Sequence, residues 1–225
     1  MTEKIRTQPT RETSVQLPLR EVTLDGTLTL PENPQGVILF AHGSGSSRFS
    51  PRNHFVAQAL NRGRFGTLLF DLLTAEEDQV DQRTRELRFD IELLARRVIG
   101  AVDWVYRHPD TQGLPIGLFG ASTGAAAALV TAAFRPAEVC AVVSRGGRPD
   151  LAGADTLEQV LVPTLLIVGG DDQPVIELNE QAMRHMRAET RLEIVPGATH
   201  LFEESGALEE VARLARGWFE EHLVS

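Results

Sequence analysis

The sequence is short of lysine, of net positive charge and of cysteine, and these shortages exclude classes of protein. Lys4 is the only lysine among 225 residues, and the formal net charge is −9. Because nucleic acids and anionic membranes are bound mainly by basic surfaces, we expect neither as a partner. Cys140 is the only cysteine, which excludes an intramolecular disulfide and a cysteine metal site.

Long hydrophobic runs are also missing. No segment approaches the ~18 consecutive apolar residues of a membrane span, and Met1–Pro18 lacks the apolar core of a signal peptide. We therefore expect a cytoplasmic protein. A hydrophobic content of 42% suffices for one well-buried core. We predict an irregular lead-in over residues 1–13 and one domain over residues 14–225.

Apolar runs and helical patterns alternate along the chain. Val15–Leu19 and Val22–Leu30 alternate around Asp25-Gly26 and indicate an antiparallel strand pair. Further strands are predicted over Val37–Ala41, Thr67–Leu72, Leu114–Phe119, Val139–Val143, Thr164–Val168 and Leu192–Val195. Helices are predicted over Asn53–Asn61, from Ile91 to the stop at His108-Pro109, and over Ala125–Ala133, Ile176–Met186 and Leu208–Leu223. This order predicts an α/β fold with a mostly parallel sheet of about eight strands, helices on both faces and no large cap.

Thr74–Arg88 is the one long charged segment between these elements. We interpret it as a surface loop or the start of a solvated helix.

One stretch combines a buried strand, a sharp turn and a helix made of small residues. Ser122 lies in this turn, between Gly120 and Gly124, and the pattern G-x-S-x-G is that of a nucleophile elbow. Residues without bulk are required there because the flanking backbones pass close together. On its own, the pattern is equally compatible with a glycine-rich turn whose serine caps the helix.

Other polar residues also follow predicted strands. The loops that hold Ser44, Arg145, Asp172 and His200 should all open at the carboxyl edge of the sheet, where ligands bind in such folds. A serine hydroxyl needs a base and a group that orients the base. The order Ser122, Asp172, His200 is the order expected for this sheet topology.

These motifs resemble the α/β-hydrolases, and in particular their small, capless dienelactone-hydrolase-like branch. The resemblance extends over residues 14–222 and rests on four motifs, which are His42-Gly43-Ser44-Gly45, Gly120-Ala121-Ser122-Thr123-Gly124, Gly169-Gly170-Asp171-Asp172-Gln173-Pro174-Val175 and Gly197-Ala198-Thr199-His200. It implies a hydrolase that cleaves a small carboxylic ester or lactone through an acyl-enzyme, with no cofactor and no metal.

The resemblance also implies a role for each residue. Ser122 would be the nucleophile, His200 the general base and Asp172 the orienting carboxylate, with the backbone N–H groups of Ser44 and Thr123 as the oxyanion hole. Asp171 is adjacent to Asp172 and competes for the orienting role; Asp172 fits the family pattern better. Dienelactone hydrolases proper carry cysteine where this chain has serine, so the dienelactone substrate does not carry over.

Further polar residues near these loops have less specific interpretations. Asp71, at a strand end, is expected to cap the loop that follows, and His42 to brace its own loop. The other histidines, His54, His108, His185 and His222, are read as surface groups without metal-ligand spacing.

Arginine residues follow two of the loops at the predicted site. Arg48, Arg52, Arg145 and Arg148 are candidates for binding an anionic group of the substrate, because guanidinium groups pair with carboxylates. The alternative is that they form structural salt bridges with Asp71, Asp150 or surface acids.

The same side chains are compatible with other functions. A thioesterase or a small amidase would use the same triad, and a non-catalytic binding protein can share the fold. The sequence is compatible with a monomer or a homodimer.

Overall fold

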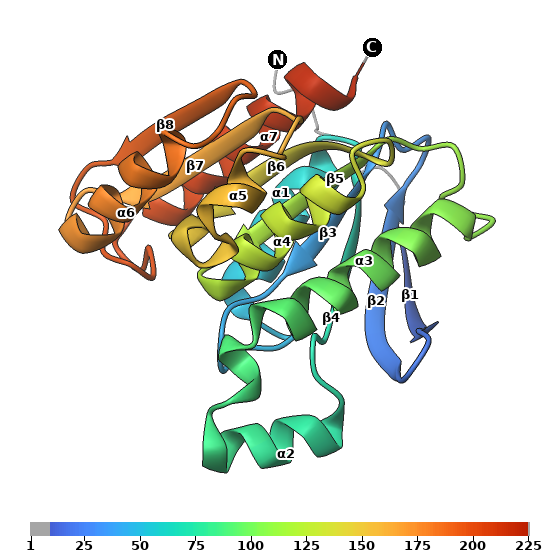
Figure 1. Cartoon of the computed structure of the whole chain (residues 1–225). Coiled ribbons are helices and arrows are strands. Elements are labelled where there is room, and N and C mark those ends of the chain that lie inside the picture. The colour runs from blue at the N-terminus through green and yellow to red at the C-terminus, as the bar shows by residue number, and fades with distance from the viewer. Residues whose placement is uncertain (1–9, 225) are drawn as a thin grey trace, which may run out of the picture.

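The computed structural model describes residues 10–224, which form one eight-stranded sheet with helices on both faces (Figure 1). The strands are β1 (Thr10–Pro18), β2 (Thr23–Pro31), β3 (Val37–Ala41), β4 (Gly66–Phe70), β5 (Ile116–Ala121), β6 (Val139–Arg145), β7 (Thr164–Gly169) and β8 (Thr190–Val195). The α-helices are α1 (Pro51–Arg62), α2 (Ala75–Thr84), α3 (Ile91–Arg107), α4 (Thr123–Phe134), α5 (Ala154–Leu157), α6 (Gln173–Met183) and α7 (Ala207–Leu223). The predicted fold class is confirmed.

The sheet has the strand order β1-β2-β4-β3-β5-β6-β7-β8. The pairs β1–β2 and β2–β4 are antiparallel, and all later pairs are parallel. Strands β3 to β8 therefore end at the same edge, and the loops after them are neighbours. This edge holds the candidate site.

The predicted antiparallel pair is present, and its first strand begins earlier than predicted. The chain reverses at Leu19–Val22, where the Leu19 N–H donates to the Val22 carbonyl at 2.8 Å. Gly26 lies inside β2 opposite Val15, where a Cβ would press on Leu17. Residues 10–13 belong to β1 and not to an irregular lead-in; residues 1–9 of that lead-in lie outside the described residues.

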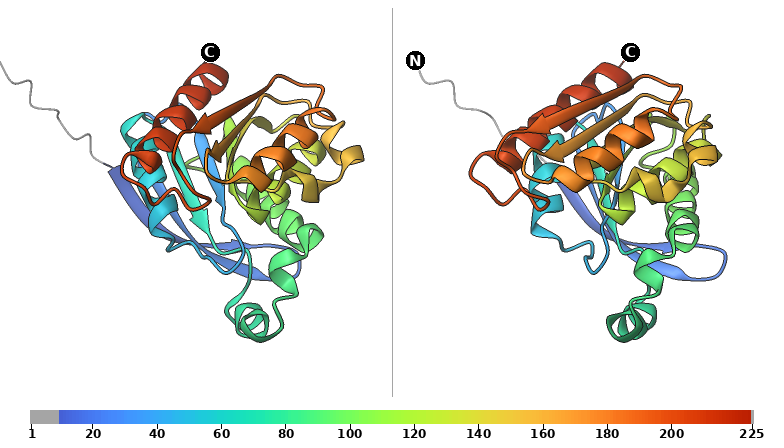
Figure 2. Two further views of the ribbon diagram at one scale, coloured as in Figure 1. Left: turned by 90° about the vertical axis from the view of Figure 1, so that its left-hand side faces the viewer. Right: turned by 60° about the vertical axis from the view of Figure 1, so that its left-hand side comes forward.

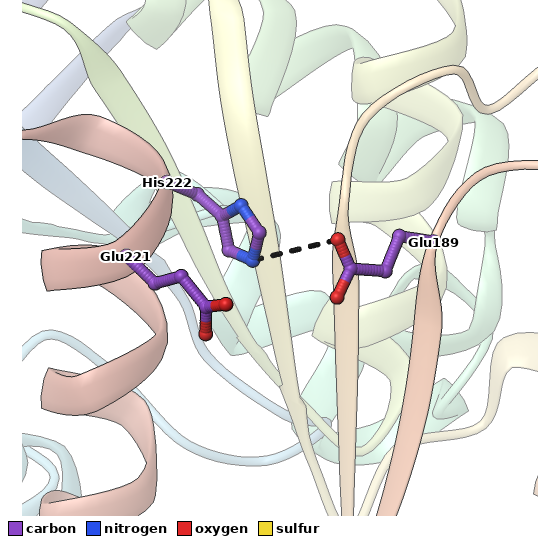
Figure 3. Close-up of side chains that lie close together, drawn as sticks. All are labelled: Glu189, Glu221 and His222. Atoms are coloured by element: carbon purple, nitrogen blue, oxygen red, sulfur yellow. Dashed lines mark ion pairs between the residues drawn. The ribbon is translucent and has the colours of Figure 1, made fainter. Parts of the chain in front are cut away.

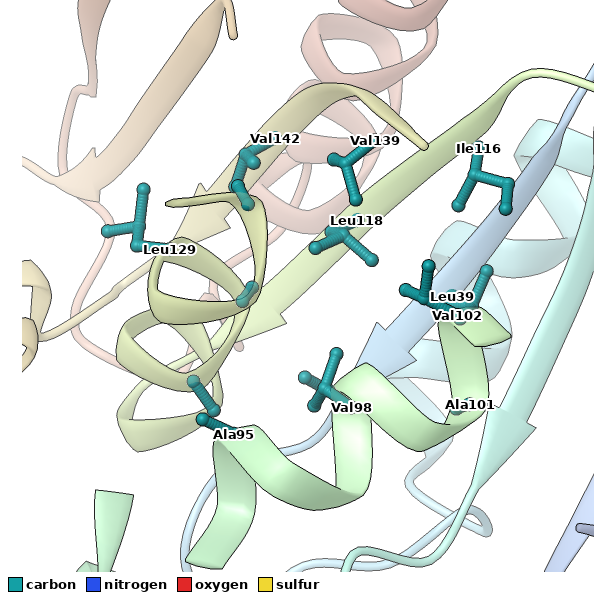
Figure 4. Packing of buried hydrophobic residues seen from close by; sticks show 14 of the residues in the cluster. Leu39, Ala95, Val98, Ala101, Val102, Ile116, Leu118, Leu129, Val139 and Val142 are labelled. Carbon is teal, nitrogen blue, oxygen red and sulfur yellow. The ribbon is translucent and has the colours of Figure 1, made fainter. Parts of the chain in front are cut away.

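Each face of the sheet carries its own apolar core, because every buried strand alternates its side chains between the two faces. Leu39, Leu118 and Val142 pack on one face against α3 and α4 (Figure 4). Ile38 and Phe119 pack on the other face against α1 and α7. The sheet is thus buried on both sides, which fixes the positions of its strand ends.

Helix α2 is the element that the sequence left undecided between a loop and a helix. It begins with a capping box, in which the Thr74 side chain accepts from the Glu77 N–H and the Glu77 carboxylate accepts from the Thr74 N–H. A short 3₁₀ turn, Leu87–Phe89, leads from it to α3. The helix projects from the rest of the molecule in every view (Figures 1 and 2).

Over residues 10–224, no helix has the length and apolar character needed to cross a bilayer.

Candidate active site

The turn at Ser122 joins β5 to α4 and is backbone-strained. Ser122 has φ 50° and ψ −122°, outside the regions that residues with a side chain favour. A Cβ on Gly120 would collide with the backbone of Ala125, and one on Gly124 with the backbone of Ala41. The two glycines are therefore a steric requirement of this turn. The strain holds Ser122 at the N-terminal end of a buried helix.

His200 and Asp172 meet at the same edge, from the loops after β8 and β7. The His200 Nδ1 lies 2.7 Å from the Asp172 Oδ2, and the Asp172 side chain is 14% exposed. Asp171 is exposed, and its backbone N–H donates to the Ala198 carbonyl at 3.0 Å. Of the two adjacent aspartates, the structure thus brings Asp172 to the imidazole.

Ser122 and His200 are both adjacent to the end of β6. The Ser122 N–H donates to the Arg145 carbonyl at 3.3 Å. A Cβ on Gly146, the next residue, would lie 3.6 Å from the His200 Cε1. Within the described residues no hydrogen bond joins the Ser122 hydroxyl to the His200 ring. Ser122 and His200 therefore lie on either side of Arg145-Gly146, and Asp172 contacts His200.

The loop after β3 closes the other side of Ser122. A Cβ on Gly43 would lie 3.1 Å from the Ser122 Cβ, so the loop backbone passes directly beside the serine. Among residues 10–224, neither the Ser44 N–H nor the Thr123 N–H donates to a protein acceptor. Both groups predicted to form the oxyanion hole therefore retain a free donor.

His42 fixes this loop to the end of β4. Its Nε2 accepts from the Leu72 N–H at 3.0 Å, and its Nδ1 lies 3.0 Å from the Gly43 carbonyl. Burial lowers the pKa of His42, with opposing contributions from the Gly43 hydrogen bond and from nearby acids. The neutral ring fits both contacts, donating through Nδ1 and accepting at Nε2. The bracing role predicted for His42 is confirmed.

Asp71 acts on this loop as well. Its carboxylate accepts from the backbone N–H of Arg48 at 2.7 Å and pairs with the Arg48 guanidinium. The prediction that Asp71 caps the loop after it is thus wrong, because its carboxylate binds Arg48 in the loop after β3.

Two of the four candidate arginines, Arg48 and Arg148, pair with aspartates. Arg48 pairs with Asp71, and Arg148 pairs with Asp150 through two hydrogen bonds of 2.8 and 2.7 Å. Hydrogen bonding to Asp150 raises the pKa of Arg148. For both arginines the salt-bridge alternative is confirmed.

The remaining two arginines are close to each other. Arg52 pairs with Glu203 at 2.9 Å, which leaves its Nε buried without a partner. Arg145 is 8% exposed, and its Nε and Nη1 have no partner among the described residues. Burial, followed by the charge of Arg52, lowers the pKa of Arg145 to about 10. Arg145 is thus the only one of the four without a carboxylate in the described structure.

A cavity of about 630 Å³ opens beside the loop after β3. Gly43 and Ser44 form its border with the candidate site, and α2 with its flanking residues forms the far wall. No pattern in the sequence indicates this cavity, because its wall combines the hairpin after β1, two strand-end loops and α2.

His222 differs from the surface group that was expected. Its side chain is 12% exposed, and its ring packs against Trp218 in a tilted arrangement, with the ring centroids 4.2 Å apart. Of the other three histidines, only His185 is exposed; His54 and His108 are half-buried.

The structure also brings His222 to two acidic side chains. Possible ligand atoms of Glu189, Glu221 and His222 lie within 4.8 Å of one another (Figure 3), in the only such group among residues 10–224. Spacing could not reveal this group, because Glu189 comes from the start of β8. The Arg191 guanidinium lies 3.1 Å from Glu189 and 3.8 Å from Glu221, so a cation already sits between the two carboxylates.

Comparison with known proteins agrees with this architecture. The model of the alpha/beta hydrolase domain family matches residues 34–213. The chain belongs to this family. Within it, the chain is similar to the crystal structure of a dienelactone hydrolase from Anabaena variabilis, at 57% identity and a TM-score of 0.93 over 95% of this chain and 98% of that one. It is thus dienelactone-hydrolase-like, as the motifs predict.

More distant structures share the fold. Est1E from Butyrivibrio proteoclasticus is 14% identical, with a TM-score of 0.78 over 92% of this chain and 98% of that one.

The curated relatives of this chain carry the name of a transferase and not of a hydrolase. Over 215 residues the chain is 57% identical to a Mycobacterium tuberculosis protein named "Putative phosphoribosyl transferase", covering 96% of this chain and 47% of that protein. The chain spans about half the length of the curated relatives that it matches.

Proposed function

We propose that this protein is a serine hydrolase that cleaves a small carboxylic ester or lactone through an acyl-enzyme intermediate. The observation that carries the proposal is the 2.7 Å contact between His200 and Asp172, formed beside the strained turn that holds Ser122. A buried carboxylate on Nδ1 leaves Nε2 of the imidazole as the base for a serine hydroxyl.

Each residue then has one role. Ser122 attacks the carbonyl carbon while His200 takes the hydroxyl proton, and the ester C–O bond breaks as His200 returns that proton to the leaving alcohol. Water, deprotonated by His200, then cleaves the acyl-enzyme and releases the acid. The N–H groups of Ser44 and Thr123 stabilise the oxyanion, each donor contributing about 3 kcal/mol to lowering the barrier.

A panel of p-nitrophenyl esters of increasing acyl length tests this function. We expect Ser122→Ala and Asp172→Asn each to lower kcat/KM by roughly 10³-fold or more, since the residues of a catalytic triad act as a unit and the loss of one disables the others. Asp171→Asn is the matched control, because it changes the same charge one residue away on an exposed side chain. Equal rates for wild type and Ser122→Ala would contradict the proposal.

The thioesterase and amidase alternatives share every group named above. Thioester and anilide analogues of the best ester separate them, because the same acyl group is then presented on different leaving groups. Each kcat/KM is divided by the rate constant for hydroxide-catalysed hydrolysis of the same compound. A higher ratio for the thioester or the anilide than for the ester would assign the chain to that alternative.

The transferase name of the curated relatives is not carried over to this chain. That name belongs to proteins of which this chain matches 47%. The cavity beside the candidate site is lined by more carboxylates than guanidinium groups, which disfavours a ligand with several phosphate groups.

The expected anionic substituent of the substrate now depends on Arg145. If this arginine binds such a group, Arg145→Ala will reduce kcat/KM more for anionic esters than for neutral ones. Equal losses on both kinds of ester would end that part of the proposal.

A further inference from the structure

We propose that the cavity beside the oxyanion loop (residues 43–48) selects esters that carry a cationic group, such as a quaternary ammonium, on the portion that extends over Gly43 and Ser44. This inference rests on the proposed hydrolase function, because it concerns the substrate of the same site. It is carried by the position of the cavity, by the charges in its wall and by the way those charges are held.

The cavity borders the loop that flanks the candidate nucleophile, although Ser122 and His200 are not among the residues that line it. Gly43 lines it and is also the residue whose added Cβ would lie 3.1 Å from the Ser122 Cβ. Ser44, whose free N–H belongs to the proposed oxyanion hole, lines it too. A substrate whose carbonyl oxygen binds at Ser44 would then extend one substituent past Gly43 and Ser44 into the cavity.

The wall of the cavity is strongly acidic. Its charged residues are five carboxylates and two guanidinium groups, an excess of three negative charges, namely Asp25, Asp71, Glu76, Asp78, Asp81, Arg48 and Arg88. His42, also in the wall, is buried with a lowered pKa and adds no charge at neutral pH. An anion entering this space meets like charge, whereas a cation meets opposite charge.

Both guanidinium groups are already neutralised by partners in the wall. Arg48 pairs with Asp71 and lies 3.8 Å from Asp25. Arg88 donates through Nε to Asp81, which is 1% exposed. Both positive charges are therefore compensated by carboxylates, and neither arginine is free to pair with an anionic ligand.

The uncompensated charge comes mainly from α2. Glu76 and Asp78 lie in its first turns and form no ion pair among the described residues. Asp78 accepts only from Gln82, at 2.7 Å, which is an i,i+4 contact on the same helix. Asp78 is also one of the acids whose charge opposes the lowering of the His42 pKa. Helix α2 thus gives the cavity its charge selectivity.

Three aryl acetates test the inference. They carry a trimethylammonio, a tert-butyl or a carboxylate group at the para position, so that the first two have the same shape and differ in charge. Each kcat/KM is divided by the rate constant for hydroxide-catalysed hydrolysis of the same ester, which removes leaving-group effects. For the wild type we expect the normalised rate to be about fivefold higher for the cationic ester than for the neutral one, and lowest for the anionic ester.

The double variant Glu76→Gln/Asp78→Asn removes the uncompensated charge. We expect it to lower the cationic-to-neutral ratio about threefold to fivefold, and 0.5 M NaCl to lower the wild-type ratio in the same direction. The double variant Glu12→Gln/Glu180→Gln is the control, because it removes two charges from exposed positions outside the cavity. This control should keep the wild-type ratio.

The results separate the two proposals. Equal normalised rates on all three esters, or a ratio that responds no more to the cavity variant than to the control, would overturn the inference and leave the hydrolase function standing. Failure of the wild type to hydrolyse any of the three esters would overturn the hydrolase function and the inference together.

Discussion

Among single residues, Arg145 is the charged group for which the fold provides the least compensation. Its guanidinium is buried beside Arg52, with two nitrogens that have no partner among residues 10–224. A pKa of about 10 in place of 12.5 corresponds to roughly 3 kcal/mol of unfavourable free energy at neutral pH. The folded pKa is the lower one, so this cost is fully present below pH 10 and decreases as the pH rises through the interval.

We therefore expect Arg145→Met to raise the free energy of unfolding by about 1–2 kcal/mol at pH 7, because an apolar chain of similar length needs no partner. Urea denaturation of wild type, Arg145→Met and the charge-conserving Arg145→Lys measures this. A loss of stability in Arg145→Met of similar size would show that the guanidinium is stabilised by contacts beyond those described.

His42 makes the free energy of unfolding depend on pH as well, but in the acidic range and not in the alkaline range of Arg145. Burial places its folded pKa below the unfolded value of about 6.5. Its contribution to stability is therefore complete above that pH and is lost as the pH falls through it. Between pH 7.5 and 5.5, urea denaturation should show a larger loss of stability for wild type than for His42→Asn. His54→Asn should follow wild type, and parallel curves for all three proteins would refute the assignment.

At the scale of elements, helix α2 is anchored by a largely buried ion pair between Asp81 and Arg88, in addition to the pair between Glu77 and Arg97 of α3. Burial opposes the charged form of Asp81, but hydrogen bonds from the backbone and side chain of Arg88 hold the pKa of Asp81 below its usual value. A Cβ on Gly45 would lie 2.9 Å from the Arg88 Nη1, so the same arginine packs against the oxyanion loop. The pair thus connects α2 to the candidate site.

We expect Asp81→Asn to lower the free energy of unfolding by about 2 kcal/mol, because it leaves the Arg88 guanidinium without its charged partner. Its kcat on p-nitrophenyl acetate should fall more than its KM rises, since the loop positions the oxyanion donor. Glu86→Gln, an exposed change near the same arginine, is the control. Unchanged stability and kcat in Asp81→Asn would contradict this role for α2.

The elements show what sequence patterns can and cannot predict. The stripe of α3 and the apolar run of β5 are decided by local periodicity, so their existence follows from the residues themselves. Periodicity failed at Thr74–Arg88, where polar residues form a helix stabilised by a capping box and by Asp81–Arg88. It located the first hairpin but started its first strand too late, because the polar residues 10–13 show no apolar alternation and are placed in β1 only by pairing with β2.

At the scale of the whole molecule, the convergence of Ser122, Asp172 and His200 could be predicted because parallel strands end at one edge. The partners of the arginines were predicted in part: Asp71 and Asp150 were named from the loops near Arg48 and Arg148, whereas Arg52 pairs with Glu203, which is 151 residues away and was not named. The cavity was equally hidden, because loops and a helix from separate parts of the chain form its wall. The sequence thus predicts the architecture better than it predicts the distribution of charge around the candidate site.

The central claim is that Ser122 is a nucleophile activated by His200. Incubation of the folded protein with a fluorophosphonate probe, followed by peptide mass spectrometry, tests it most directly. We predict a single adduct on Ser122 that is absent from Ser122→Ala and strongly slowed in His200→Ala. Folded wild-type protein that stays unlabelled, or that carries the adduct on a different residue such as Ser44, would contradict the claim.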